Sequence, residues 1–296
     1  MRPRSADRIG AGIRTAVVLA EEHGLHVDEA QVLSRGQAVV VRLSPAPVVA
    51  RIGVEDVFGP RLEWQYGAVG LCRHLAAAGA AVIPPSDLVP AGPHERDDVV
   101  VSFWRHVDVD QSRSVDPEDA GEKLREIHEL SASYEGDLST FWPFREARRL
   151  LAHPEVVAEL TEESLALLAT VLDALEPGLL PGPERPLHGD AHIWNTLQTP
   201  AGTVWFDFDE ACRGPLEWDA ATMIQSDRVL GPKEDVRRAY RAAFGDRFGD
   251  DELLPWIDLR VVLIVEWLAV ARHRREGVPD PASGRGVAWL RQRYVG

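Results

Sequence analysis

The residues best suited to chemistry lie in the stretch 187–209, which reads LHGDAHIWNTLQTPAGTVWFDFD. Asn195 comes five positions after Asp190, and Asp207 comes twelve positions after Asn195. An Asp beside an alcohol can accept its proton, and the oxygens of Asn and Asp are ligands that Mg²⁺ prefers. This set of residues indicates phosphoryl transfer, in which a carboxylate handles the acceptor hydroxyl and a metal ion holds the phosphates.

The local pattern predicts how these three side chains are positioned. Thr203–Phe206 is β-branched and aromatic, which predicts a strand, and 196–198 predicts its partner across a turn at 199–202. Asp190 and Asn195 then lie on a loop before a hairpin, and Asp207 lies just past the returning strand. The three side chains can therefore converge on one point.

The same stretch resembles the aminoglycoside phosphotransferase and choline kinase-like family, whose catalytic loop reads HGDxHxxN and is followed by DF and an acid. It differs from protein kinases, which have HRD and DFG at these places. The segment 214–219, GPLEWD, also resembles the downstream segment of the family. The matching motif positions are His188, Gly189, Asp190, His192, Asn195, Asp207, Phe208 and Asp209.

The resemblance implies an α+β, two-lobed protein-kinase-like fold. Residues 1–104 would form a nucleotide-binding lobe with a small antiparallel sheet, and residues 105–296 a larger, mostly helical lobe with the catalytic loop and the substrate site. Hydrophobic spacing agrees with this order of elements. It predicts helices at 7–23, 61–78, 162–175, 220–229, 234–244, 251–274 and 288–294, and strands at 31–33, 38–43, 48–52 and 99–103. Another predicted helix is capped at 116–119 and runs through 130.

The resemblance also implies a role for each motif residue. Asp190 would orient and deprotonate the acceptor hydroxyl, while Asn195 and Asp207 would hold Mg²⁺ on the phosphates of ATP or GTP. The other motif residues would support the site: Asp209 as a brace or second metal ligand, Asp219 and His188 as braces of the loop, and His192 in either way. We expect Trp194 to pack against the lobe rather than to stack on substrate.

A phosphate-binding cation is expected on the third strand, where the family has Lys and in some members Arg. The chain has two lysines, Lys123 and Lys233, and neither is near this strand, so Arg51 is the predicted phosphate contact. A guanidinium can bind phosphate oxygens bidentately. The acidic partner of Arg51 is left open, because Glu63 is the only acid in the next predicted helix and does not match the family position.

The segment expected to contact adenine lies at the end of the strand predicted at 99–103. Ser102, Phe103 and Trp104 would form this hinge, and their backbone would bind the base. Trp104 can equally be a core residue.

Charge bears on the partners. The net charge is −15, and residues 1–107 carry only −1 of it, so nearly all the acidity belongs to the part with the HGD loop. Nucleic acid would need a basic face and is not expected as a partner, whereas a cationic acceptor such as an aminoglycoside or an amino alcohol fits this acidity. The alternative is that the acidic surface only keeps the protein solvated.

Location follows from composition. The two cysteines, Cys72 and Cys212, indicate no disulfide framework, and the N-terminus lacks the hydrophobic core of a signal peptide. The longest apolar run, 261–271, is too short to span a bilayer and reads as a buried helix. We therefore expect a cytoplasmic protein with no membrane partner. The oligomeric state is left open, with a monomer favoured.

Two other functions remain open. The missing strand lysine and the unmatched helix acid would also suit a catalytically silent member that binds nucleotide or a metabolite. In a metal-dependent hydrolase, His188, Asp190 and His192 would instead form a ligand cluster. That interpretation leaves Asn195 and Asp207 without a role.

Overall fold

Segments from different parts of the sequence alternate between two units of the structure. The computed structural model describes residues 5–36, 38–54, 62–97, 99–179, 184–274 and 281–295. Unit 1 comprises Met1–Val115, Glu129–Leu138 and Thr196–Ala211, and unit 2 comprises Asp116–His128, Ser139–Asn195 and Cys212–Gly296. Each unit is thus made of three separate segments, whereas the lobes predicted at 1–104 and 105–296 are each one continuous stretch. The predicted boundary between the lobes stays a prediction.

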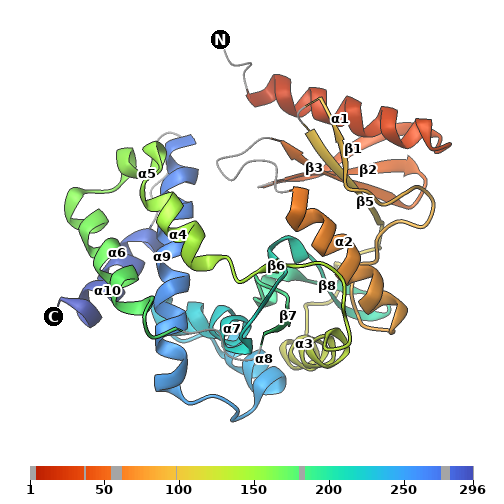
Figure 1. The fold of residues 1–296 in the computed structure, drawn as a ribbon. Coiled ribbons are helices and arrows are strands. Elements are labelled where there is room, and N and C mark those ends of the chain that lie inside the picture. Colours follow the sequence, from red (N-terminus) through yellow and green to blue (C-terminus); the bar gives the residue numbers. More distant parts are fainter. Residues whose placement is uncertain are drawn as a thin grey trace. The chain divides into compact units, whose positions relative to one another are not determined.

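Unit 1 is built on a five-stranded antiparallel sheet in the order β1-β2-β3-β5-β4 (Figure 1). Its strands are β1 (Val27–Arg35), β2 (Val39–Pro45), β3 (Val48–Val54), β4 (His94–Arg96) and β5 (Val99–Arg105). Alternate residues of β2, such as Val41 and Leu43, are buried, as the period of two of a strand requires. The helix α1 (Ser5–Glu22) adds Ala16 and Leu19 to the same hydrophobic cluster. The strands and the helix predicted here are confirmed.

The second half of unit 1 places the DFD motif. The hairpin predicted from sequence is confirmed as β8 (Thr196–Thr199) and β9 (Gly202–Trp205). Trp205 at the end of β9 exchanges backbone hydrogen bonds with Ala81 and Ile83, which follow the helix α2 (Leu62–Ala77). Because α2 also packs against the single turn η2 (Phe208–Glu210), the residues after β9 are held on both sides.

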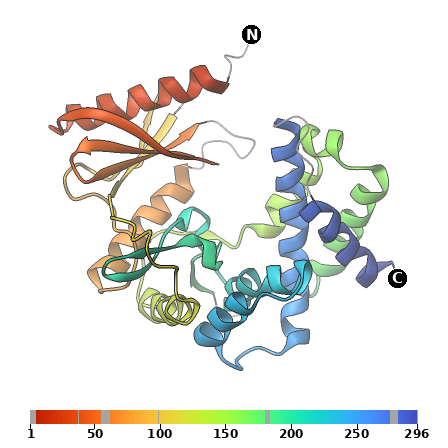
Figure 2. The same ribbon diagram turned by 180° about the vertical axis from the view of Figure 1, so that it is seen from behind.

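Unit 2 is organised around the long helix α9 (Asp250–Arg274), whose side chains Leu259, Val262 and Leu263 are fully buried. The predicted buried helix is thus confirmed. Figure 2 shows α9 from behind, with helices of this unit on several sides. Those packed on it are α4 (Pro143–Leu151), α5 (Pro154–Glu159), α6 (Glu162–Leu175), α7 (Leu216–Leu230) and α10 (Pro281–Tyr294). The helix α8 (Glu234–Phe244) packs on α7, and most of α3 (Pro117–Ser131) also belongs to this unit.

A buried acid fixes α10 on α9. Asp258 is fully buried and accepts hydrogen bonds from the indole of Trp289 at 2.7 Å, from Nε of Arg293 at 2.9 Å and from the hydroxyl of Tyr294 at 2.9 Å. A buried carboxylate is tolerated only when it is paired and hydrogen-bonded in this way. Asp258 therefore has a structural role.

A small sheet in unit 2 leads into and out of the HGD loop. Its strands are β6 (Ser139–Thr140), β7 (Arg185–Leu187) and β10 (Cys212–Gly214), and β10 lies in the middle. The loop begins directly after β7, and α7 begins two residues after β10, so the pairing of β7 with β10 brings the loop next to the N-terminus of α7. In the described parts of the chain, every helix is too short or too polar to span a bilayer.

Candidate active site

The HGD loop is a tight turn whose shape depends on glycine. Gly189 has a φ of 87°, a conformation that costs glycine little and other residues much more. The N–H of His192 then donates to the carbonyl of Asp190, and the N–H of Asn195 to the carbonyl of His192, both at 2.9 Å. The chain closes into the turn η1 (Ile193–Asn195), which brings Asn195 back to Asp190.

Two residues of α7 hold the loop in place. Asp219 is fully buried, and its two carboxylate oxygens accept the backbone N–H groups of His188 and Gly189, each at 2.9 Å. Nε2 of His128 on α3 lies 2.8 Å from the same carboxylate, and the indole of Trp218 donates to the carbonyl of Gly189 at 2.7 Å. Asp219 thus ties the loop backbone to the start of a helix.

Asp190 is surrounded by donors. The amide nitrogen of Asn195 lies 3.0 Å from Oδ2 of Asp190, and Nε2 of His192 lies 3.3 Å from the same oxygen. The other oxygen, Oδ1, accepts a hydrogen bond from the guanidinium of Arg260 on α9. Burial opposes the charge of Asp190, but Arg260 and His192 outweigh it and hold the pKa of Asp190 well below its ordinary value. The carboxylate is therefore ionised at neutral pH.

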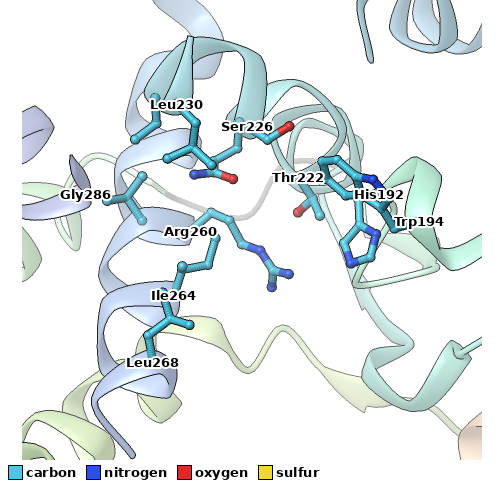
Figure 3. Close-up of a pocket in the computed structure, with 12 residues that line it drawn as sticks. His192, Trp194, Thr222, Ser226, Leu230, Arg260, Ile264, Leu268 and Gly286 are labelled. Carbon is cyan, nitrogen blue, oxygen red and sulfur yellow. The ribbon is translucent and has the colours of Figure 1, made fainter. Parts of the chain in front are cut away.

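A pocket of about 270 Å³ lies beside these residues in unit 2 (Figure 3). Two of its lining residues, His192 and Arg260, contact Asp190. The other lining residues come from η1, α7, α9 and α10: Trp194, Thr222, Gln225, Ser226, Val229, Leu230, Val261, Ile264, Leu268 and Gly286. The pocket is mostly apolar, and its polar groups include the two that touch the predicted catalytic acid.

The expectation that Trp194 packs against the lobe is wrong. Its side chain is 55% exposed and lines this pocket, with Nζ of Lys233 5.9 Å from the ring centroid. Trp194 is the second residue after the HGDxH segment and lies in the single turn η1, and its ring lies on the pocket side instead of in the core.

In unit 1, Arg51 joins the two acids of the DFD motif. It lies in β3 opposite Ser102 of β5, with a side chain that is only 16% exposed. One terminal nitrogen lies 3.1 Å from Oδ1 of Asp207, and the other pairs with Asp209. Burial works against the charge, but these two carboxylates outweigh it and raise the pKa of Arg51.

The backbone at Asp207 is unusual. Its φ of 63° and ψ of 56° place it in the left-handed region, which a residue other than glycine adopts at a cost of roughly 1–3 kcal/mol. Such outliers cluster at functional sites, because only a fixed surrounding structure keeps them. Here η2 and the pairing with Arg51 hold the residue.

The acid that pairs with the strand cation is thus supplied by the DFD motif. The side chain of Glu63 lies outside the described residues, and the described side chains of α2, from Trp64 on, include no acid. Cys72 of α2 shows that the helix lies close to the motif: its burial, and then the charge of Asp209, raise the pKa of the thiol well above its ordinary value.

The structure does not support Phe103 as a contact for adenine. Phe103 is a fully buried residue of β5, and its N–H donates to the carbonyl of Ala91 at 2.8 Å while its carbonyl accepts from Ser86 at 2.9 Å. The strand continues to Arg105, beyond the predicted hinge. The indole of Trp104 donates to the hydroxyl of Ser102 at 2.9 Å, and a role of either residue in binding nucleotide stays a prediction.

The residues predicted to hold Mg²⁺ have suitable donor atoms. The amide nitrogen of Asn195 is used twice by Asp190, which leaves the amide oxygen as a hard ligand. Asp207 offers a carboxylate of the same kind. Among the described residues no group of three or more His, Cys, Asp or Glu side chains is arranged to hold a metal ion, so the hydrolase cluster of His188, Asp190 and His192 is not supported.

Sequence reasoning missed Arg260, Trp218 and His128. Arg260 stands at the start of the apolar run of α9, where a charge usually marks a solvent-exposed position, yet its side chain is 5% exposed. A basic residue in a helix that is otherwise buried on all sides was the available signal. The contact of His128 with Asp219 could not be read from the sequence, because the two residues are 91 positions apart.

Comparison with known proteins agrees with this geometry. A family model described as the phosphotransferase enzyme family matches residues 23–256. Similar solved structures are the amicoumacin kinase hAmiN in complex with AMP-PNP, Ca²⁺ and Ami (TM-score 0.69, 12% identity, 97% of this chain and 95% of that chain) and the choline kinase LicA from Streptococcus pneumoniae (0.65, 13%, 94% and 99%). A third is the AMP-bound spectinomycin phosphotransferase APH(9)-Ia (0.61, 16%, 93% and 97%).

No curated protein sequence matches the chain significantly. The solved structures, at these low identities, establish the two-lobed kinase-like fold, with an antiparallel sheet in the N-terminal region and a mostly helical remainder. Because the family model spans most of the sequence and includes both motifs, the chain belongs to the phosphotransferase enzyme family.

Proposed function

We propose that the protein transfers the terminal phosphoryl group of ATP, or of GTP, to a hydroxyl of a small molecule. The observation that carries this proposal is the HGD loop of unit 2. Asp219 and Trp218 anchor its backbone, Asn195 and His192 fix the carboxylate of Asp190, and a pocket lies beside it. A held carboxylate beside a pocket for a small molecule is what transfer to an alcohol requires.

In this reaction Asp190 would orient the acceptor hydroxyl. The hydroxyl oxygen forms a bond to the terminal phosphorus while the bond to the leaving diphosphate breaks, and the hydroxyl proton passes to Asp190. Its lowered pKa makes Asp190 a weak base. That suits a loose transition state, in which the attacking oxygen gains little charge until late and positioning contributes most.

Arg51 and Asp207 would serve the nucleotide. The guanidinium would neutralise phosphate charge, and a bound divalent ion would add to this neutralisation. That Asn195 and Asp207 hold this ion together is a prediction from the resemblance, and so is the choice of Mg²⁺. Three related structures contain AMP-PNP, ADP or AMP, which supports ATP as the donor. Cytoplasmic location and a monomeric state also remain predictions.

Substitution of Asp190 tests the proposal. Asp190→Ala should leave nucleotide binding nearly intact and lower turnover by roughly 10²–10⁴-fold, the usual contribution of a general base. The matched control is Asp173→Asn on α6, an exposed acid paired with Arg148, which should keep normal turnover. ADP release is measured against a library of hydroxyl compounds. An Asp190→Ala variant with more than half of the wild-type rate would disprove the role of Asp190.

The second candidate is a silent member that binds nucleotide without turnover. The observation in its favour is that each motif acid is already paired with an arginine. It predicts tight ATP binding with no release of ADP above that of the Asp190→Ala variant, whichever acceptor is supplied.

A further inference from the structure

The pocket beside Asp190 has an unusual charge for an acceptor site in so acidic a chain. None of its 12 lining residues, all of them among the described residues, is an acid, although the protein has a net charge of −15. Its one permanently charged side chain is the cation Arg260. The acidic residues that made a cationic acceptor plausible from the sequence are therefore not in the lining of this pocket.

The guanidinium of Arg260 is buried, and aromatic side chains stabilise its positive charge. Its carbon Cζ lies 4.9 Å from the ring centroid of Trp267 and 5.7 Å from that of Trp218. Aromatic faces stabilise a guanidinium without neutralising it. Arg260 forms an ion pair with Asp190, the residue predicted to bind the acceptor hydroxyl.

Polar atoms of the same lining have no partner. The hydroxyl oxygens of Thr222 and Ser226 and Nδ1 of His192 are buried and make no hydrogen bond among the described residues. Figure 3 shows the guanidinium of Arg260 extending from α9 into the space that Thr222 and His192 border. Buried polar groups without partners are costly, so a polar group of a ligand would relieve this cost.

We propose that the acceptor is an anionic hydroxy compound, a hydroxycarboxylic acid with an apolar body, and that Arg260 is the residue that selects it. The carboxylate would bind Arg260 with help from the hydroxyl of Thr222. The branched aliphatic side chains Leu230, Val261, Ile264 and Leu268 line the rest of the pocket and would contact the apolar body.

This choice changes how Asp190 is used. In the structure Asp190 and Arg260 are ion partners. An acceptor carboxylate would compete for Arg260, so that Asp190 gains freedom to bind the acceptor hydroxyl. The inference rests on the proposed function only in naming the ligand an acceptor, because the preference for an anion is a property of the pocket.

Binding of matched compounds tests the preference. The probes are α-hydroxyisocaproate, its amide and the amino alcohol with the same carbon skeleton, together with equivalent triplets on larger skeletons. Calorimetry or NMR titration of the full-length protein gives the ratio of affinities within each triplet. We expect the carboxylate to bind at least about tenfold more tightly than the amide, the value of one charge-assisted hydrogen bond, and the amine to bind most weakly.

Three variants separate recognition from simple structural support. Arg260→Lys should keep the preference for the carboxylate at reduced affinity, and Arg260→Met should lose the preference. Ile264→Ala, which changes the volume of the pocket and not its charge, should weaken all three members of a triplet alike. Asp190→Asn removes the competing anion and should tighten carboxylate binding at least about threefold, even though its turnover is lost.

The outcomes are distinct. Equal binding within every triplet, a preference for the amine, or no binding of any carboxylate would overturn the inference, and so would weaker carboxylate binding in Asp190→Asn. Carboxylate binding without ADP release would overturn the proposed function and leave the anion preference standing. ADP release with an amino alcohol as the best acceptor would support the proposed function and overturn the anion preference.

Discussion

Replacement of Arg51 tests whether the strand cation binds phosphate. The side chain bridges Asp207 and Asp209, and its removal leaves two acids that are 38% and 26% exposed. Breaking a fully buried ion pair costs about 3–5 kcal/mol, but water reaches both of these acids and reduces the loss. We therefore expect Arg51→Ala to lower the free energy of unfolding by roughly 1–3 kcal/mol.

The loss in nucleotide binding is separate from this loss of stability. A charge-assisted hydrogen bond contributes about 1.5–3 kcal/mol, and about 1.4 kcal/mol is a factor of ten in affinity. Arg51→Ala should bind ATP at least about tenfold more weakly than the wild type. The ATP affinity of Arg51→Lys should lie between those of Arg51→Ala and the wild type, because an ammonium is a point charge that cannot bind two oxygens bidentately. Adenosine has no phosphate, so its affinity should not change.

Calorimetry with ATP and adenosine measures both effects. Arg96→Ala is the control, because Arg96 is an exposed arginine of the same sheet that pairs with Glu22 on α1. A double-mutant cycle of Arg51→Ala with Asp209→Ala isolates the pair, and a coupling of about 0.5–3 kcal/mol is expected for residues in direct contact. Equal ATP affinity in wild type, Arg51→Ala and Arg51→Lys would show that the phosphate cation lies elsewhere.

Two further predictions concern stability. Both carboxylate oxygens of Glu266 are buried without a hydrogen-bond partner among the described residues, and burial, then the charge of Glu146, raise the pKa of Glu266 well above its ordinary value. The folded state therefore keeps a proton that the unfolded state releases near pH 4.5. As a result, the free energy of unfolding falls by about 1.4 kcal/mol per pH unit above that pH until the pKa of the folded state is reached. Glu266→Gln should remove this slope, as urea unfolding between pH 4 and 8 would show, and parallel curves for the two proteins would refute the assignment. A Cβ on Gly286 would lie 2.8 Å from Val265, whereas one on Gly284 in the same helix meets nothing within 4 Å. Gly286→Ala should therefore lose about 1–3 kcal/mol by overpacking and Gly284→Ala gain up to about 1 kcal/mol in thermal unfolding, and equal effects would contradict the close approach of α10 to α9.

Hydrophobic spacing predicted the elements whose burial follows a regular period. The helices expected at 162–175 and 234–244 have these bounds in the structure as α6 and α8, and the hairpin after Asn195 is also present. The helix expected at 288–294 begins earlier in the structure, at Pro281. The prediction began too late because two glycines interrupt the hydrophobic pattern of this helix. One of them, Gly286, is where the helix packs on α9.

The elements that sequence reasoning missed depend on distant partners. The strands β6, β7 and β10 have two or three residues each, and only their pairing with one another defines them. The helices α4 and α5 begin at Pro143 and Pro154 and are too short to show a clear period. Local patterns cannot reveal such elements, because their stability comes from contacts that are formed only in the folded chain.

The same distinction applies to the site. The motif acids could be located by spacing alone, because a loop and a hairpin of fixed length connect them. Their partners could not, since Arg260 is on a helix far along the chain and reaches Asp190 only through the packing of α9. The sequence indicated a supporting role for Asp209. It could not show that Asp209 pairs with Arg51, because β3 and η2 are far apart in the sequence and meet only in the folded unit 1.

In a chain with two lysines, the cations paired with the motif acids are both arginines: Arg260 with Asp190, and Arg51 with Asp207 and Asp209. A guanidinium does not lose its proton at any pH at which the protein is folded, and the pKa of Asp190 lies below its ordinary value. The pairing of Arg260 with Asp190 therefore does not switch with pH near neutrality. What can separate these ions is a competing anion, which is a nucleotide phosphate for Arg51 and, in our proposal, an acceptor carboxylate for Arg260. Exchange of ion partners, rather than titration, would then be the event by which each substrate frees the acid that acts on it.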